Sequence, residues 1–298
     1  MNLEASWTSN LISLTLNPAS NLKLSILLET CSRMRSLQTL RLIFGFGRKG
    51  PFPEDSLHYV IIPSLSTLVV ECPFDVSLAL LDHIKSAPGC SLRLSTNLTN
   101  IQSITSTDLV AAQRIIAKFT NNYFCHRSAT SFRLSFDSNF IKVEDIEGFM
   151  VSIQSVTTVP VSLFPLLLGT FEPAHTSGVK TLWVTTNALI HIINLHNGDG
   201  QRRPFPQIKT LTWQPDSFPD CTSLIVNFLA SRRRLGMPIE IFDLTEWYPT
   251  FSHIPMDTKM LEEIPGLKVI WRDDEGEDTL REYICGSGRP QVLPGNPS

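Results

Sequence analysis

Three glycines have the spacing of a phosphate-binding turn. Gly45, Gly47 and Gly50 follow the apolar stretch LRLIF in the order G-x-G-x-x-G, which in dinucleotide-binding folds lets the backbone approach a pyrophosphate at a helix N-terminus. Glu71 stands about 20 residues further on, where an acidic residue would bind the ribose. However, the intervening stretch PFPEDSLHYVIIPSL contains three prolines and leaves no room for the helix. We therefore interpret the glycines as a loop between secondary-structure elements and expect no cofactor.

Cysteine and histidine residues show no pattern of nucleophilic catalysis or metal binding. Cys125 and His126 are adjacent in the chain, which does not direct one side chain at the other, and no G-x-S-x-G sequence is present. His191 and His196 stand outside the i, i+4 spacing that places two ligands on one helical face. The six cysteines include no C-x-x-C pair, so we interpret them as small buried side chains in a reducing compartment. We expect no catalytic residue, no metal site and no enzymatic activity.

The charge composition argues against nucleic acid as a partner, because a formal net charge of -3 offers no basic surface for phosphates. The run Arg232 to Arg234 ends a predicted helix, where three arginines complement the helix dipole and stay solvated. Residues 159–171 form the longest apolar run, which is too short and too rich in proline to span a bilayer. The N-terminus also lacks the pattern of a signal peptide. We expect a soluble protein of the cytoplasm or nucleus that binds neither nucleic acid nor membranes.

Short strands with the pattern L-x-x-L-x-L recur along the chain. Their apolar residues alternate with Thr, Arg, Ser or Lys, which favours a sheet with one face on the core and the other in solvent. A doubly wound sheet, covered by helices on both faces, would instead show near-continuous apolar strands. The strands are predicted at residues 11–16, 37–42, 65–70, 91–94, 131–136, 179–184, 208–213, 239–244 and 267–271, with one further candidate at 157–163.

Segments with helical periodicity lie between these strands, so that strand and helix alternate at a period of roughly 20 to 30 residues, which is typical of a leucine-rich-repeat solenoid. Each repeat alone cannot cover its apolar face, whereas stacked repeats share one core. We expect an α/β horseshoe with parallel β-strands on the concave face and helices on the convex face. The helices are predicted at residues 24–34, 75–87, 106–122, 143–153, 187–196 and 221–236.

The predicted solenoid is a single domain over residues 1–272, with about nine to ten repeats. Residues 273–298 are acidic and then rich in glycine and proline, a composition that favours disorder. We therefore expect a disordered tail after the last repeat.

Two stretches carry a resemblance to a known family. FPQIKTLTW with the later FLASRRRLGMPIEIFDL, and LEEIPGLKVIWRDDEG near the C-terminus, resemble the leucine-rich-repeat region of the F-box proteins of mushroom-forming fungi. The resemblance covers most of residues 10–274. It implies that the repeats capture a substrate for a ubiquitin ligase, while an F-box segment ahead of them docks a Skp-type adaptor.

The match to this family is incomplete at two places. No LP-x-E-[IL] segment precedes the first repeat, so we expect no docking of a Skp-type adaptor. The repeat consensus L-x-x-L-x-L-x-x-N is complete only in VKTLWVTTN, which ends at Asn187, and an asparagine ladder is therefore not expected. Two alternatives stay open: an α/β nucleotide-binding enzyme that uses the Gly45–Gly50 loop, and a truncated F-box relative without partner function.

One residue in each strand stands between the last two apolar positions and is expected to point outward on the concave face. Arginine provides bidentate donors and tryptophan a large amphipathic anchor, and both types are enriched at binding hot spots. We hypothesise that this face captures a protein partner, including one with acidic groups, and that the chain is a non-enzymatic interaction scaffold. The predicted partner-binding residues are Thr15, Arg41, Val69, Arg93, Arg133, Trp183, Thr212 and Asp243.

Overall fold

The computed structural model divides the chain into two compact units. Unit 1 comprises Met1–Ser128 and Ser138–His175, and unit 2 comprises Ala129–Asp137 and Thr176–Ser298. The prediction of one solenoid domain over residues 1–272 stays a prediction, because it concerns how the two units are joined. The loop with Gly45, Gly47 and Gly50 lies outside the described residues. These are residues 9–17, 24–44, 58–98, 105–155, 157–171, 173–197, 205–214, 222–246, 258–272 and 279–289.

Unit 1 contains a sheet of six described strands. Neighbouring strands of this sheet run parallel, except for the last two, which are antiparallel. A separate parallel pair joins β3 (Val60–Ile62) to β5 (Ile84–Ser86). The spatial order of the sheet is β1 (Ser13–Leu16), β2 (Thr39–Ile43), β4 (Thr67–Pro73), β6 (Ser91–Leu98), β9 (Met150–Ser155) and β8 (Phe140–Asp145).

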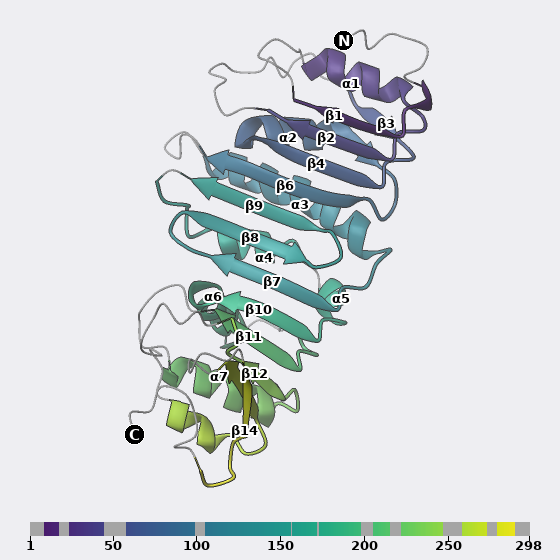
Figure 1. Cartoon of the computed structure of the whole chain (residues 1–298). Helices are drawn as coiled ribbons and strands as arrows, with labels where there is room; N and C mark the ends of the chain where they lie inside the picture. Colours follow the sequence, from purple (N-terminus) through teal and green to yellow (C-terminus); the bar gives the residue numbers. More distant parts are fainter. Residues whose placement is uncertain are drawn as a thin grey trace. The chain divides into compact units, whose positions relative to one another are not determined.

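Helices cover one face of the unit 1 sheet. The helices of unit 1 are α1 (Leu24–Arg33), α2 (Phe74–His83), α3 (Ser106–Phe124), α4 (Leu163–Leu168) and α5 (Pro173–Thr176). Figure 1 shows α2, α3 and α4 behind the strands, and α2 packs against β4 and β6. A capping box starts α3, since Thr105 Oγ1 accepts a hydrogen bond from Asp108 N and Asp108 Oδ2 accepts one from Thr105 N. We call the opposite face, which is turned to the viewer in Figure 1, the open face.

The alternation within each strand places leucines on the core side and polar residues on the open face. Leu40 and Leu42 of β2 are fully buried, whereas Arg41 between them is exposed. The same holds in β6, where exposed Arg93 stands between two buried leucines. Burial of one leucine side chain contributes about 1.5 to 3 kcal/mol. A slip of one residue would turn these leucines to solvent, so the hydrophobic pattern specifies which residues occupy the open face.

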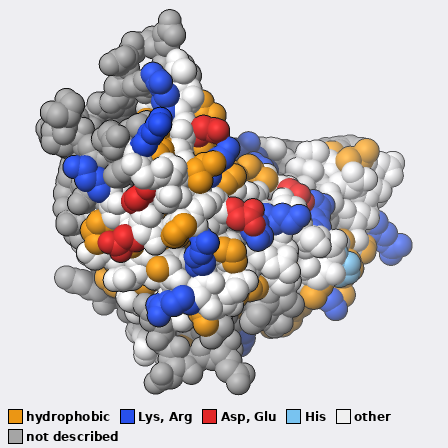
Figure 2. All heavy atoms as spheres, turned by 90° about the horizontal axis from the view of Figure 1, so that it is seen from below, with side chains coloured by type: hydrophobic (Ala, Val, Ile, Leu, Met, Phe, Trp, Pro, Cys, Tyr) orange, Lys and Arg blue, Asp and Glu red, His pale blue; other side chains and the backbone are white. Residues whose placement is uncertain are grey.

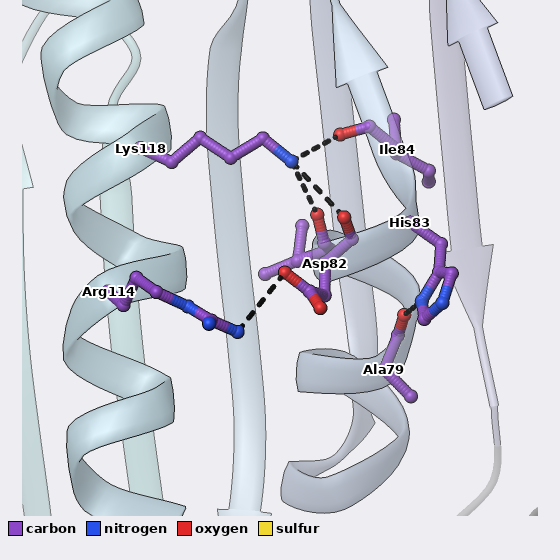
Figure 3. A network of polar contacts seen from close by, with 7 residues as sticks. Ala79, Asp82, His83, Ile84, Arg114 and Lys118 are labelled. Atoms are coloured by element: carbon purple, nitrogen blue, oxygen red, sulfur yellow. Dashed lines mark hydrogen bonds and ion pairs between the residues drawn. The ribbon is translucent and has the colours of Figure 1, made fainter. Parts of the chain in front are cut away.

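A lysine of α3 caps the C-terminal end of α2 (Figure 3). Lys118 Nζ donates to three carbonyl oxygens at 3.1 to 3.5 Å, among them those of Asp82 and Ile84. Arg114, on the same side of α3, forms an ion pair with the Asp82 carboxylate at 3.6 Å. Burial lowers the pKa of Lys118, and the nearby Asp82 opposes this. The ammonium group thus satisfies helix-end carbonyls that lack a partner within α2 and fastens α2 to α3.

The hairpin of β8 and β9 replaces the helix predicted at residues 143–153, and that prediction is wrong. Ile141 and Val143 alternate with half-exposed residues and are buried, which is the period of two expected for a strand. In the turn, Gly148 has a φ of 140°, a backbone angle that residues with a Cβ rarely adopt. Ser91 Oγ donates to Gly148 O at 2.6 Å, so β6 holds the turn in place.

A buried polar contact joins the hairpin to α3. Tyr123 OH donates to Asp145 Oδ2 at 2.9 Å, and Asp145 is 2% exposed. Around this contact, the rings of Tyr123, Phe124, Phe149 and Phe171 pack with centroids 4.8 to 6.1 Å apart. Burial raises the pKa of the Asp145 carboxyl, while the hydrogen bond from Tyr123 lowers it. The position of the hairpin in the sheet therefore depends on contacts that are remote in sequence.

Unit 2 also contains a sheet of six described strands. Neighbouring strands of this sheet run parallel from β7 to β13, and β13 pairs antiparallel with β14. The helical segments are α6 (Thr186–Asn197), α7 (Thr222–Arg234) and the 3-10 helix η4 (Thr258–Glu263), and α6 packs against β7, β10 and α7. The spatial order of the sheet is β7 (Ser131–Phe136), β10 (Thr181–Thr185), β11 (Thr210–Gln214), β12 (Ile241–Asp243), β13 (Lys268–Arg272) and β14 (Leu280–Ile284).

Two further sequence predictions are wrong. Residues 157–163 form no strand; Leu163 N donates to Pro160 O, and α4 begins at Leu163. In the tail predicted to be disordered, residues 279–289 are described and contain β14. There Tyr283 is buried, and its hydroxyl donates to Glu262 Oε2 at 2.9 Å. The segment is ordered by its pairing with β13 and by this hydrogen bond, neither of which the composition reveals.

Both units are therefore α/β, with mostly parallel strands, which confirms the α/β part of the predicted fold class; the leucine-rich-repeat horseshoe stays a prediction. Within the described ranges, no helix combines the length and the apolar character needed to cross a membrane.

Candidate interaction face

The open face of unit 1 carries four of the predicted partner-binding residues in one row. Cα partners join Thr15 to Arg41, Arg41 to Val69, and Val69 to Arg93 across four parallel strands. Thr15, Arg41 and Arg93 are exposed, and Val69 is half-buried. The register expected from the leucine pattern is thus confirmed in unit 1, while partner binding stays a prediction.

Two residues that were not predicted from the sequence extend this row. Met150 of β9 is the Cα partner of Arg93, and Glu144 of β8 is the partner of Met150. Both were overlooked because the segment was predicted to be helical. The alternation of FIKVED, with Ile141 and Val143 as its apolar members, is the signal that would have revealed them.

The charged side chains on the unit 1 open face form two ion pairs, and Arg93 belongs to neither of them. Arg41 Nη2 lies 2.8 Å from Glu71 Oε1, and Lys142 Nζ lies 2.6 Å from Glu144 Oε2. For Arg93, the described residues offer no carboxylate within ion-pairing distance. The face therefore presents one exposed guanidinium that is free to bind an external group.

Unit 2 carries the other four predicted residues, again in one row. Cα partners join Arg133 to Trp183, Trp183 to Thr212, and Thr212 to Asp243. The Arg133 guanidinium lies over the Trp183 indole, 5.8 Å from the ring centroid, which is a cation–π contact. The predicted register is confirmed in this unit as well.

Thr212 and Asp243 bind each other within this row. Thr212 Oγ1 donates to Asp243 Oδ2 at 3.1 Å, while Thr245 donates to Asp243 Oδ1 from its backbone N and its hydroxyl at 2.8 and 2.7 Å. Thr212 is 1% exposed, so the expectation that its side chain is accessible to a partner is wrong. The Asp243 carboxylate is already occupied by threonine donors, which leaves Arg133 and Trp183 as the main contact residues of the row.

The residues considered for catalysis and metal binding have other partners. His126 Nδ1 lies 3.1 Å from the carbonyl oxygen of Asn122, and His191 packs against the ring of Phe136. The His196 ring packs edge-on against Phe228. In the part of the chain that the structure describes, no group of three or more His, Cys, Asp or Glu side chains is placed to hold a metal ion.

The arginine run at the end of α7 is only partly solvated, contrary to expectation. Arg232 is 1% exposed, and its Nη2 donates to the carbonyl oxygens of Phe205 and Pro206 at 3.1 and 3.0 Å. Burial lowers the pKa of Arg232 to about 10. Arg233 donates to the carbonyl oxygen of Pro265. These two arginines therefore fasten α7 to neighbouring segments.

Four of the five described cysteines are buried, as predicted, and Cys221 lies outside the described residues. Cys31, Cys72, Cys90 and Cys285 are buried, and burial raises the pKa of each thiol, to about 12 for Cys31 and Cys72. Cys125 is exposed, so the prediction is wrong for this residue. Raised thiol pKa values make the buried cysteines poor nucleophiles.

Figure 2 shows the molecule from below the view of Figure 1, with basic, acidic and hydrophobic side chains interspersed. On this face, the side chains that are described form no continuous patch of one charge.

Comparisons with protein-family models, with curated proteins and with solved structures found no match for this chain. The case for a function therefore rests on the two rows and on the charges beside them.

Proposed function

We propose that the chain is a leucine-rich-repeat-like solenoid that serves as a non-enzymatic scaffold for a protein partner. Support for the repeat architecture comes from the Cα pairing, which joins equivalent positions of successive strand units such as Arg41 and Val69. Stacked repeats share one core in this way. Helices cover one face of unit 1, so the partner binds the open face, where the polar positions of the strands are accessible.

The observation that carries this proposal is the residue composition of the two rows. Exposed Arg93 and Arg133, and half-buried Trp183, belong to the types that dominate binding energies at protein interfaces. An exposed cation–π contact contributes only about 0.5 to 1 kcal/mol, so the stacking of Arg133 on Trp183 adds little to stability. It does hold both side chains in one arrangement, which lowers the entropy lost on binding.

The resemblance to F-box proteins suggests a biological setting for this scaffold. We extend the proposal to substrate recognition for a ubiquitin ligase, provided that an F-box is supplied by another segment or by a partner. The substrate would then occupy the open face, and the ligase would be recruited elsewhere.

Affinity capture with charge-reversed variants tests the scaffold proposal. The double variant Arg93→Glu with Arg133→Glu is compared with the wild-type chain and with the matched control Arg35→Glu with Arg234→Glu, whose arginines are exposed outside the two rows. Circular dichroism verifies that all three fold. We expect proteins captured by the wild type and by the control to be lost from the row variant, as measured by quantitative mass spectrometry. An unchanged set of captured proteins would show that the rows are not the binding site.

A further inference from the structure

Two arginines on the open face of unit 1 flank the strand that carries Glu71. Arg41 and Arg93 are the Cα partners of Val69 on its two sides, and Glu71 stands two residues further along the same strand. Glu71 is engaged by Arg41 at 2.8 Å. Because Arg41 engages Glu71 and no described carboxylate forms an ion pair with Arg93, Arg93 stays unpaired in this part of the face.

The second acid of this face does not reach Arg93. Glu144 is held by Lys142 at 2.6 Å, and Met150 stands between Glu144 and Arg93 in the row. Neighbouring strands lie about 4.8 Å apart, so Glu144 is roughly 10 Å from Arg93 along the row. The excess positive charge of the face is therefore located at Arg93.

Apolar side chains flank Arg93 on both neighbouring strands. Val69 and Met150 are its Cα partners, and both are half-buried, so that part of each side chain faces solvent. We call these three residues the Arg93 patch. When a partner covers such a patch, water is excluded and an ion pair at its centre becomes stronger than in open solvent.

We propose that the Arg93 patch binds an acidic segment of the protein partner, in which an Asp or Glu side chain stands beside an aliphatic or aromatic one. The inference rests on the proposed function, because it specifies the partner of the same open face. The carboxylate pairs with the guanidinium through two parallel N–H···O bonds. The neighbouring apolar side chain of the partner lies against Val69 or Met150.

A carboxylate matches this patch better than a phosphate group does. A phosphorylated side chain carries nearly two negative charges and is recognised by clusters of arginines. Arg93 is a single guanidinium, and the nearest cations on its face, Arg41 and Lys142, are neutralised by Glu71 and Glu144. One unpaired positive charge between two apolar side chains therefore selects a singly charged, partly apolar segment.

Selection from a random peptide library on the immobilised full-length chain tests this inference. We expect enrichment of peptides in which Asp or Glu is adjacent to Leu, Ile, Val, Met or Phe. The affinity of one enriched peptide is then measured by fluorescence anisotropy. It is compared with that of two derivatives, in which the acidic residue is replaced by glutamine or by phosphoserine, and we expect both to bind more weakly.

Two substitutions on the same face are expected to act in opposite directions. Arg93→Gln removes the unpaired guanidinium and should weaken binding of the acidic peptide about tenfold, the effect of losing one charge-assisted contact. Glu71→Gln frees Arg41 and should strengthen binding about threefold, because the patch gains a second unpaired arginine. The matched control is Glu29→Gln, which removes an ion-paired carboxylate of α1 at the same change of net charge.

The outcomes separate this inference from the proposed function. Enriched peptides that depend on Trp183 or Arg133, and not on Arg93, would overturn the inference and leave the scaffold proposal intact. Enrichment of basic or phosphopeptide-like sequences would also overturn the inference and leave the scaffold proposal intact. Stronger binding by the phosphoserine derivative than by the acidic peptide would do the same. Failure to enrich any acidic and apolar peptide over a control surface also overturns the inference. Peptides whose binding is unchanged by every row substitution would overturn both proposals.

Discussion

Replacement of Tyr123 by phenylalanine should destabilise the β8–β9 hairpin without changing its packing. The substitution keeps the ring, which packs among Phe124 and Phe149, and removes the hydroxyl that donates to Asp145 at 2.9 Å. Asp145 is 2% exposed, so water cannot replace the lost donor. The hairpin carries Met150, Glu144 and Lys142 on the open face, which links this contact to the interaction face.

The size of the effect follows from the charge of the acceptor. A hydrogen bond to a charged group contributes about 1.5 to 3 kcal/mol, and one between neutral groups about 0.5 to 1.5 kcal/mol. We therefore expect Tyr123→Phe to lower the free energy of unfolding by about 2 kcal/mol at a pH where Asp145 is ionised. In the background of Asp145→Asn, where the acceptor is neutral, the same substitution should cost about 1 kcal/mol.

The loss of stability caused by Tyr123→Phe should also depend on pH. The burial of Asp145 determines whether this loss grows or shrinks as the pH rises. Burial raises the pKa of Asp145 in the folded protein above that in the unfolded chain, about 3.9. The folded state then binds the proton more tightly, so the contribution of Asp145 to stability falls as pH rises from the unfolded pKa through the folded one. Loss of the Tyr123 hydroxyl raises the folded pKa further. The cost of Tyr123→Phe should therefore grow as the pH rises above the unfolded pKa and through the raised folded pKa of Asp145.

Hydrogen exchange of peptides that cover residues 140–155 measures this local stability directly, and urea unfolding followed by circular dichroism gives the value for the whole chain. Four proteins are compared at pH 4.5 and pH 7.5: the wild type, the two single variants and the double variant. Equal costs of Tyr123→Phe at both pH values, or equal costs with and without the Asp145 carboxylate, would show that Tyr123 does not stabilise a charged Asp145.

Three further predictions concern other parts of the chain. Lys118→Met removes the donor to three carbonyl oxygens at the end of α2 and should lower the free energy of unfolding by about 1 to 2 kcal/mol; thermal melting should show a smaller loss for Arg114→Met, whose ion pair is exposed, and equal losses would contradict the capping role. Native-state labelling with a thiol reagent at pH 8 should modify Cys125 well before Cys31 or Cys72, whose pKa values are about 12; labelling of Cys31 at the rate of Cys125 would show that it is not buried. A double-mutant cycle between Arg133→Ala and Trp183→Ala should give a coupling energy in unfolding of less than about 1 kcal/mol; a coupling of several kcal/mol would mean that the pair serves stability rather than binding.

The strand register was predictable because it follows from a local pattern. In the strands that carry Arg41 and Arg93, each arginine stands between two leucines, and a strand turns successive side chains to opposite faces. Equivalent strands must then align their leucines to share one core, which brings Arg41, Val69 and Arg93 into one row.

The hairpin and β14 were not predictable from local patterns. Residues 143–153 fit a helical period as well as an alternating one, and contacts of Tyr123 and Ser91, distant in sequence, favour the strands. Likewise, the acidic composition before β14 predicts disorder. Burial of Tyr283 and its hydrogen bond to Glu262 reverse that expectation.

For the row in each unit, the side chains on the solvent side of a strand follow from the sequence alone, because apolar and polar residues alternate at consecutive positions. Which of these side chains bind one another becomes visible only when the strands are packed together. Glu71 binds Arg41, which is 30 residues away, and Thr212 is buried beside Asp243. Such pairings depend on which side chains of neighbouring strands lie close enough to bind one another. The residues of a single strand do not show this.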